Sequence, residues 1–233
     1  MSILPEHPNP HHICTWDDAS RCSDCGLRAT LGCRLDPREF RFFILNQIPS
    51  LVIATFGLAL VGLVTGVWWP LVVFGAACIA LWGLGIETRV LCSHCPYWAE
   101  GGKTLHCWAL TGSPKIWRYR PGPMKGWEKA AIIAFFSFLM AFPVLAQACG
   151  IAYLAANYLS FGLYALLGMS GVTIATVLAG LQFFLILKHC FCSRCVNFSC
   201  PLNDVPKKLV DEYLRKNPVM KEAWEKNGYR LGH

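Results

Sequence analysis

The chain alternates between polar segments and two long stretches that contain no charged side chain. No Asp, Glu, Lys or Arg occurs from Phe42 to Ile86 or from Ala130 to Leu187. A helix of about 20 apolar residues crosses the hydrocarbon core of a bilayer, so each stretch is long enough for two crossings. The pattern therefore predicts two transmembrane hairpins, flanked and separated by polar segments.

Proline, tryptophan and the flanking lysines set the expected helix limits. Pro49 suits the first turn of a helix, and the Trp68-Trp69-Pro70 step is typical of a turn at the membrane interface. Lys129 and Lys188 enclose the second stretch. We expect its two helices to be joined by the uncharged aromatic residues of 154–162. The four expected helices cover residues 48–67, 70–88, 128–153 and 163–188.

The distribution of positive charge predicts the orientation. All 21 Lys and Arg residues lie before residue 42, between 89 and 129, or from 188 onward. The positive-inside rule then places both termini and the central loop in the cytoplasm, which requires an even number of crossings in each stretch. Membrane orientation explains the net charge of +7. A nucleic-acid partner is not expected, because the bases are divided among three segments and mixed with acids.

The predicted fold is an all-α integral membrane protein of the plasma or inner membrane, with four transmembrane helices in two hairpins and a cytoplasmic, cysteine-rich, metal-binding cap. Only 15% of the residues are charged, as this class requires. The tail is expected to form two short amphipathic helices, over 207–216 and 220–226. The expected segments are 1–41 (N-terminal, cysteine-rich), 42–90 (first hairpin), 91–127 (a loop rich in Cys and Trp), 128–189 (second hairpin) and 190–233 (a cysteine knuckle and the helical tail).

Cysteine carries most of the candidate chemistry. Eleven of the 13 cysteines lie outside the apolar stretches, on the side expected to be cytoplasmic. That compartment is reducing, so metal binding or redox chemistry is favoured over disulfides. The tetrapeptide C-S-x-C occurs three times, at 22–25, 92–95 and 192–195. The candidate metal ligands are Cys14, Cys22, Cys25, Cys33, Cys92, Cys95, Cys107, Cys190, Cys192, Cys195 and Cys200.

The cysteine spacing is compatible with iron–sulfur clusters and with zinc. The C-x2-C spacing lets two thiolates reach one metal, and the knuckles at 92–95 and 192–195 both follow a predicted hairpin, so they could meet in one four-cysteine site. Proline follows Cys95 and Cys200, as it often follows ligands in cluster-binding loops. We expect iron–sulfur clusters, with zinc as the alternative and thiol redox chemistry without metal as a third hypothesis.

Three histidines adjoin these cysteines and are possible further ligands. His94 lies inside the second knuckle, while His106 and His189 are each next to a cysteine. One of them could complete a site with Cys92, Cys95 and Cys107. Solvated loop residues are the competing interpretation. Cys78 and Cys149, within the apolar stretches, are expected to be small packing residues.

The expected function is electron transfer, from a soluble donor through the cap to a membrane quinone or a partner subunit. If the protein is part of an enzyme, it would be a redox subunit, and no catalytic residue can be named. The loop at 110–127 interleaves bases and aromatics, which suits lipid headgroups. A structural zinc scaffold that binds a protein partner or larger complex, and a metal-sensing or trafficking protein, are the alternatives. For Gln147, Asn157 and Gln182, hydrogen bonds between helices are favoured over a quinone site.

Overall fold

The computed structural model describes residues 9–17, 20–83 and 85–232, and within these ranges it has helices and no β-strand. Two β-like residues, Thr104 and Pro114, form an isolated antiparallel bridge. The α-helices are α1 (Pro37–Thr65), α2 (Trp69–Cys78), α3 (Ile86–Val90), α4 (Gly126–Ala156), α5 (Tyr158–Ile186), α6 (Lys207–Lys216) and α7 (Pro218–Lys226). The π-helices are η3 (Ile79–Gly83) and η6 (Leu187–Cys192), and the 3-10 helices are η1 (Cys14–Trp16), η2 (Cys22–Asp24), η4 (Cys92–His94) and η5 (Pro96–Ala99).

The chain forms two compact units. The cap unit consists of Met1–Phe43, Glu87–Ile132 and Leu187–His233. The helical unit consists of Ile44–Ile86 and Ile133–Ile186. We take the membrane-spanning segments to be those parts of the long helices that lie in the helical unit. All eleven candidate cysteine ligands fall in the cap unit.

Three helices are long and apolar enough to cross a membrane. They are α1, α4, and α5 with its continuation to Cys192. A fourth crossing is formed only if Trp69–Gly83 and Ile86–His94, which meet at a bend of 46°, act as one broken span. The prediction of an all-helical protein with apolar spanning helices is therefore confirmed. The residues between the two parts include Gly85, whose φ of 70° suits glycine and interrupts the helix.

The first helix begins earlier than expected. Pro49 was expected to open it, but α1 starts at Pro37 and Pro49 lies in its interior. The cause is a helix start that the apolar pattern does not reveal. Asp36 accepts a hydrogen bond from the backbone N–H of Arg38 at 2.8 Å, and Pro37 occupies the first helical position, where its missing N–H is harmless.

The link in the second hairpin is shorter than expected. Instead of a joining stretch over 154–162, only Asn157 separates α4 from α5. Asn157 donates from Nδ2 to the carbonyl of Tyr153 at 2.9 Å, which ends α4 with a local side-chain bond. A second break follows inside α5 at Gly162, whose φ of 74° and ψ of 177° are not helical. The helix expected to begin at 163 therefore starts beyond a real kink.

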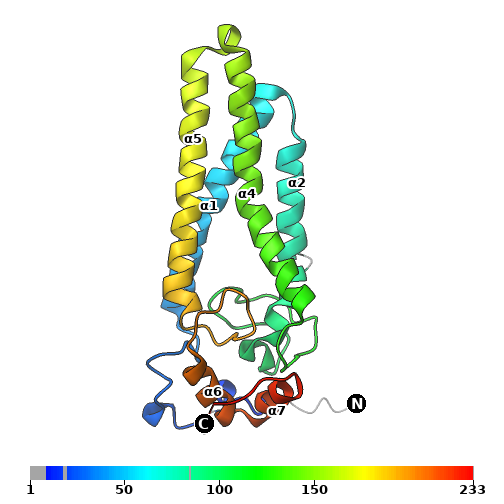
Figure 1. Cartoon of the computed structure of the whole chain (residues 1–233), viewed down its shortest axis with the longest axis vertical. Helices are drawn as coiled ribbons and strands as arrows, with labels where there is room; N and C mark the ends of the chain where they lie inside the picture. The colour runs from blue at the N-terminus through cyan, green and yellow to red at the C-terminus, as the bar shows by residue number, and fades with distance from the viewer. Residues whose placement is uncertain (1–8, 18–19, 84, 233) are drawn as a thin grey trace. The chain divides into compact units, whose positions relative to one another are not determined.

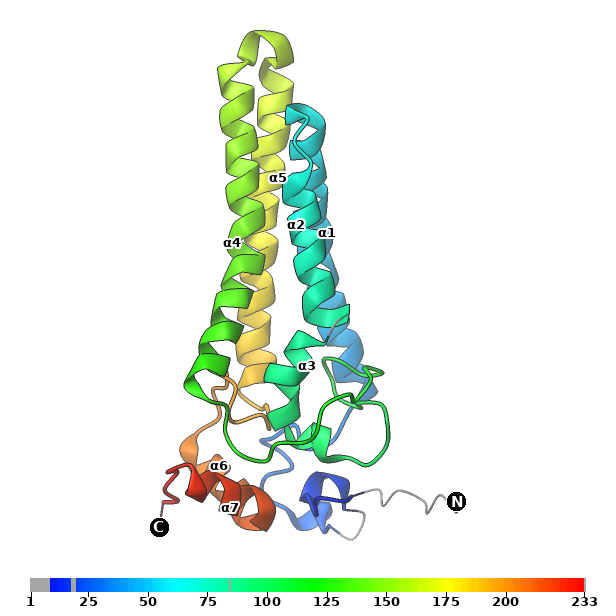
Figure 2. The same ribbon diagram turned by 90° about the vertical axis from the view of Figure 1, so that its right-hand side faces the viewer.

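Within the helical unit, α1 packs against α2, α4 and α5. One apolar cluster joins Ala54 and Leu58 of α1 to Phe74 of α2 and Leu139 of α4. A second cluster joins α1 to α4 and α5 through Val61, Leu154 and Met169. Figures 1 and 2 both show α4 beside α5, and Figure 2 shows α1 beside α2.

Gln147 is fully buried in this bundle and accepts a hydrogen bond from Thr176 at 3.1 Å. The amide also lies directly against Gly57, where a Cβ would stand 2.2 Å from Nε2. Gln147 on α4 therefore contacts both α1 and α5. This agrees with the interpretation of Gln147 as an interhelical contact.

The cap unit has its own apolar core, which includes Tyr97, Tyr213 and Leu214. The two tail helices were expected at 207–216 and 220–226, and they are found as α6 and α7. They pack against this core through Val210, Leu214 and Trp224 rather than extending into solvent. The cysteines Cys14, Cys25, Cys33, Cys92 and Cys95 pack around the same core.

Candidate functional site

Tight turns present the cysteines of two C-S-x-C tetrapeptides. Cys22 begins η2 and Cys92 begins η4, and in each case the carbonyl of the first cysteine accepts a hydrogen bond from the N–H of the second. These bonds measure 3.4 Å for Cys25 to Cys22 and 2.9 Å for Cys95 to Cys92. A 3-10 turn of this kind brings both thiols to the same side of the loop. The third tetrapeptide continues directly from the π-helix η6, which ends at Cys192.

Cys14, Cys22, Cys25 and Cys33, here called the N-terminal cysteine set, line one cavity of about 660 Å³. Two side chains from the distant tail donate to its sulfurs. Lys216 Nζ lies 3.1 Å from Cys25 Sγ, and Asn217 Nδ2 lies 3.3 Å from Cys14 Sγ. Asn217 is fully buried, and its Oδ1 also accepts from the backbone N–H of Cys14 at 2.7 Å. The end of α6 therefore fixes this set in place.

The electrostatics of the N-terminal set differ from thiol to thiol. Burial raises the pKa of Cys33 to about 12, and the charges of Cys14, Cys25 and Cys22 add to the rise. Burial opposes ionisation of Cys25 too, but the hydrogen bond from Lys216 holds the pKa of Cys25 below its usual value. Cys14, Cys22 and Cys25 thus lie close enough to Cys33 to raise its pKa, whereas Lys216 favours the thiolate of Cys25.

Cys92, Cys95, Cys107, Cys192, Cys195 and Cys200, here called the central cysteine set, come from two distant segments. The knuckles at 92–95 and 192–195 lie side by side, because Asn197 donates from Nδ2 to the carbonyl of Leu91 at 3.1 Å. Asn203 donates to the carbonyl of Cys195 at 2.7 Å and closes the second loop. This arrangement fits the expectation that the two knuckles are neighbours.

Mutual charge also links the central set. Burial raises the pKa of Cys195, and the charges of Cys95 and Cys200 raise it further. Burial raises the pKa of Cys95 as well, and the charges of Cys107 and Cys200 add to it. Burial also raises the pKa of Cys92, and the charges of Glu87 and Cys107 add to the rise. Without a cation these buried thiols stay protonated at neutral pH, and a bound metal ion would replace their protons.

Tyr97 lies between the two cysteine sets. Burial raises the pKa of its hydroxyl, and the next contributions come from Cys95 and Cys195 of the central set, with Cys33 of the N-terminal set also contributing. Tyr97 donates to the carbonyl of Gly32 at 2.8 Å. The Trp16 ring meets the Tyr97 ring edge-on at 5.8 Å, and Trp16 Nε1 donates to the carbonyl of Pro96. The buried Tyr97 hydroxyl therefore lies near thiols of both sets.

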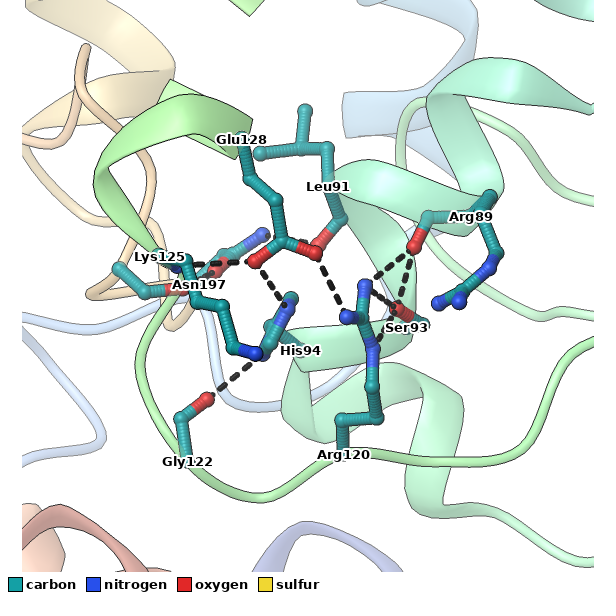
Figure 3. Close-up of polar contacts among 10 residues, drawn as sticks. Arg89, Leu91, Ser93, His94, Arg120, Gly122, Lys125, Glu128 and Asn197 are labelled. Atoms are coloured by element: carbon teal, nitrogen blue, oxygen red, sulfur yellow. Dashed lines mark hydrogen bonds and ion pairs between the residues drawn. The ribbon is translucent and has the colours of Figure 1, made fainter. Parts of the chain in front are cut away.

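A buried polar network fixes the knuckle at 92–95, as Figure 3 shows. Glu128 is 1% exposed, and its two oxygens lie 2.6 Å from Arg120 Nη1 and 3.3 Å from His94 Nε2. Arg120 also donates to the hydroxyl of Ser93. His94 Nδ1 lies 2.6 Å from the carbonyl of Gly122, which can only accept, so this nitrogen carries the proton. As placed, both ring nitrogens of His94 face protein oxygens.

The remaining candidates lie apart from the two sets. His106 Nδ1 lies 2.9 Å from a carboxylate oxygen of Glu100, on the surface. His189 and Cys190 are exposed at the end of η6. Cys78 and Cys149 belong to the helical unit. In the described ranges, no three His, Cys, Asp or Glu side chains stand in an arrangement that could hold a metal ion.

Sequence reasoning did not identify Lys216, Asn217, Tyr97 or the partners of His94. The Asn217-Pro218 step is a local signal for a helix start, since Asn precedes the first position of α7 and Pro occupies it. No local signal could have revealed its contact with Cys14. Comparison of the chain with protein families, with characterised proteins and with solved structures gave no match.

Proposed function

We propose that this is a membrane electron-transfer protein whose cap carries two iron–sulfur centres ligated by the two cysteine sets. It would pass electrons from a soluble one-electron donor to a membrane quinone or a partner subunit. The N-terminal set supplies Cys14, Cys22, Cys25 and Cys33 to one centre. The other centre takes its ligands from the central set. Both termini, and the cap with them, face the cytoplasm, and the broken helix of α2 and α3 is the fourth crossing.

The observation that carries the proposal is the gathering of ten cysteines into two sets, of which six cysteines lie in or pack against one buried core: Cys14, Cys25, Cys33, Cys92, Cys95 and Cys107. Buried thiols in a reducing compartment gain little as disulfides. Clustered thiolates repel one another unless a cation neutralises them, and metal ions or clusters supply that charge.

The hydrogen bonds to the sulfurs of the N-terminal set support a cluster. Lys216 and Asn217 donate to Cys25 and Cys14, and hydrogen bonds to sulfur are a usual way for proteins to tune cluster potentials.

The residues around the sets fit electron transfer. A bound cluster would supply the capacity to store one electron. Lys216 lies at the exposed rim and offers positive charge to Cys25, which stabilises the additional negative charge of a reduced centre. Tyr97 is buried and lies near thiols of both sets. Glu128, Arg120 and His94 hold the knuckle at 92–95 rigid, so that little reorganisation accompanies the change of charge.

The orientation in the membrane follows from the charges. The turn between α1 and α2 and the turn at Asn157 carry no Lys or Arg, whereas the cap unit carries all 21. Four crossings keep every basic segment on one side. The alternative with three crossings, by α1, α4 and α5, would place residues 1–36 on the opposite side from 87–132 and 188–233, although all three segments contribute to the cap core.

Anaerobic purification of the full chain, followed by visible spectroscopy before and after dithionite, tests the proposal. We expect a broad visible absorption that bleaches on reduction. The Cys149→Ser variant is the matched control, because Cys149 lies in the helical unit, and it should keep the spectrum. A colourless protein that holds stoichiometric zinc would overturn the proposal in favour of a structural scaffold.

A further inference from the structure

A cavity of about 410 Å³ lies within the helical unit and is lined by residues of α1, α4 and α5. Ser50 and Ala54 come from α1, Pro143 from α4 and Gly180 from α5. The volume lies in the range of about 300–1,000 Å³ that small-molecule sites occupy. Every lining residue belongs to the helical unit, so the cavity is separate from the two cysteine sets.

The cavity lies at the depth of lipid chains. Ala141 lines it and is eleven residues beyond Ala130, where the second charge-free stretch begins. At about 1.5 Å per residue, Ala141 lies about 17 Å along the helix from that point, near the middle of a hydrocarbon core of about 30 Å. Leu181 on α5 also lines the cavity and is six residues before Leu187, where the stretch ends. That separation is about 9 Å, so the cavity extends from the middle of the core toward the polar ends of α4 and α5.

The rim of the cavity is open to the surroundings of the helices. Leu145 is 64% exposed, Leu181 55% and Val177 38%, and Ser137 and Ala141 are exposed as well. Exposed side chains on spanning helices face lipid, so a ligand can enter from the bilayer. None of the lining residues is charged. A charged headgroup would therefore find no partner here.

A proline accounts for one polar group at the wall. Pro143 lies inside α4 and is buried. Because proline has no N–H, the carbonyl of Leu139, one turn earlier, lacks its helical donor. Leu139 and Pro143 both line the cavity, and the carbonyl points along the helix from one toward the other, so it lies at the same wall. A carbonyl without a donor is costly in hydrocarbon, which favours a ligand that donates a hydrogen bond.

Ser50 adds a hydroxyl from α1. It lines the cavity and is 9% exposed, and its side chain makes no hydrogen bond to another residue of the described ranges. Two other hydroxyls of α1 behave differently, since Thr55 and Thr65 each donate to the carbonyl four residues earlier. The Ser50 hydroxyl is therefore available to a ligand in the cavity.

We infer that this cavity binds a neutral membrane lipid that carries a hydroxyl group on an apolar chain, as a fatty alcohol or an isoprenoid alcohol does. The apolar wall receives the chain. A hydroxyl both donates and accepts, so it can donate to the carbonyl of Leu139 and accept from Ser50. A ketone or an ester only accepts, and a phospholipid headgroup is charged. The site is additional to electron transfer and requires no metal centre.

The test is photolabelling of the full chain in phosphatidylcholine nanodiscs with hexadecanol that carries a diazirine in its chain, followed by peptide mass spectrometry. We expect saturable labelling within residues 137–145 or 176–184, which unlabelled hexadecanol displaces. A farnesol probe with the same photoreactive group distinguishes the two sources of the hydroxyl. Stronger labelling by the farnesol probe would assign an isoprenoid alcohol, and stronger labelling by the hexadecanol probe a fatty alcohol.

Three variants locate the site. Ala141→Phe should abolish the displaceable labelling, because Ala141 is exposed at the rim and a larger ring there fills the cavity without displacing packed neighbours. Ala148→Phe is the matched control, since Ala148 is exposed on the same helix outside the cavity, and it should label like the wild type. Ser50→Ala removes one hydrogen bond and should weaken the apparent affinity roughly three- to tenfold.

The methyl ether of the hexadecanol probe cannot donate a hydrogen bond and should label the cavity weakly. Equal labelling by the ether and the alcohol, or labelling of Ala141→Phe at the level of the wild type, would overturn the inference. A second copy of the chain is the competing occupant. It would give a dimer that Ala141→Phe converts to a monomer, without displaceable labelling, and this result would also overturn the inference. None of these outcomes depends on iron or sulfide, so failure here leaves the proposed function standing.

Discussion

Asn217 and Cys14 stand 203 residues apart in the chain and hold each other through two hydrogen bonds. The Oδ1 of Asn217 accepts from the N–H of Cys14, and its Nδ2 donates to the sulfur of Cys14. The same Nδ2 donates to the carbonyl of Tyr213 at 2.8 Å. One fully buried amide therefore joins the N-terminal cysteine set to the two tail helices.

Replacing Asn217 by alanine should destabilise the cap. The change leaves the buried N–H of Cys14 and the carbonyl of Tyr213 without their partner, which costs about 2–3 kcal/mol. The measurement is thermal unfolding of the full chain in detergent. Asn227→Ala is the control, because Asn227 is exposed and donates only to the carbonyl of Ala223. Equal melting temperatures in the two variants would contradict this role of Asn217.

Lys216 should affect the reduction potential of one centre only. Lys216→Met removes a positive charge and the hydrogen bond to Cys25, so the reduction potential of one of two centres should fall while the other is unchanged. Redox titration followed by electron paramagnetic resonance measures both potentials. Lys208→Met, on the same helix and without a contact to sulfur, should change neither. If Lys216→Met leaves both potentials unchanged, the ammonium does not act on a centre.

Asp211 should stabilise the tail in a pH-dependent manner. Although burial opposes it, hydrogen bonds from Lys207 and from the Tyr229 hydroxyl hold the pKa of Asp211 below its usual 3.8. A depressed folded pKa means that the stabilisation is complete above about 3.8 and is lost as the pH falls through the folded value. Asp211→Asn should therefore lower the free energy of unfolding at neutral pH by about 1–3 kcal/mol, and the melting temperature with it.

The difference between the wild type and Asp211→Asn should shrink only when the pH falls below about 3.8, the usual value for the carboxyl. Thermal melts over a pH series measure it. The exposed Glu222, which pairs with Lys226, provides the control variant Glu222→Gln. A difference that is constant from neutral to strongly acidic pH would show that the Asp211 charge is not the cause.

The sequence predicted the helices better than their ends. The charge-free stretches are direct evidence for apolar spans, and the amphipathic pattern of the tail predicted its two helices. The start of α1 was missed because its first two turns carry Arg38, Glu39 and Arg41, which look like loop residues in a search for apolar runs. Asp36-Pro37 was the signal that could have located it.

The cysteine groups were visible in the sequence, but their surroundings were not. The N-terminal set is local, since its members lie within twenty residues, and the repeated tetrapeptides suggested the pairing of the two knuckles. The donors Lys216 and Asn217, the ring of Tyr97 between the sets, and the contact of His94 with Glu128 all depend on tertiary packing. Spacing along the chain carries no information about such contacts.

Reporter fusions test the four-crossing topology. A phosphatase that is active only outside the cytoplasm should be inactive when it is fused to the C-terminus. It should be active when it is inserted after Gly66, in the turn between α1 and α2. The expected pattern follows from the 21 basic residues, all of which lie in the cap unit. Activity at the C-terminus would contradict the cytoplasmic placement of the cap on which this topology rests.

The central claim, that two cysteine sets each hold an iron–sulfur centre, is tested most directly by the iron and acid-labile sulfide content per chain. The wild type is compared with Cys25→Ser and Cys95→Ser, and with Cys149→Ser as control. We predict iron and sulfide in the wild type and in Cys149→Ser, and loss of about half of both in each of the other variants. Iron and sulfide at background in the wild type, or unchanged contents in Cys25→Ser and Cys95→Ser, would contradict the account.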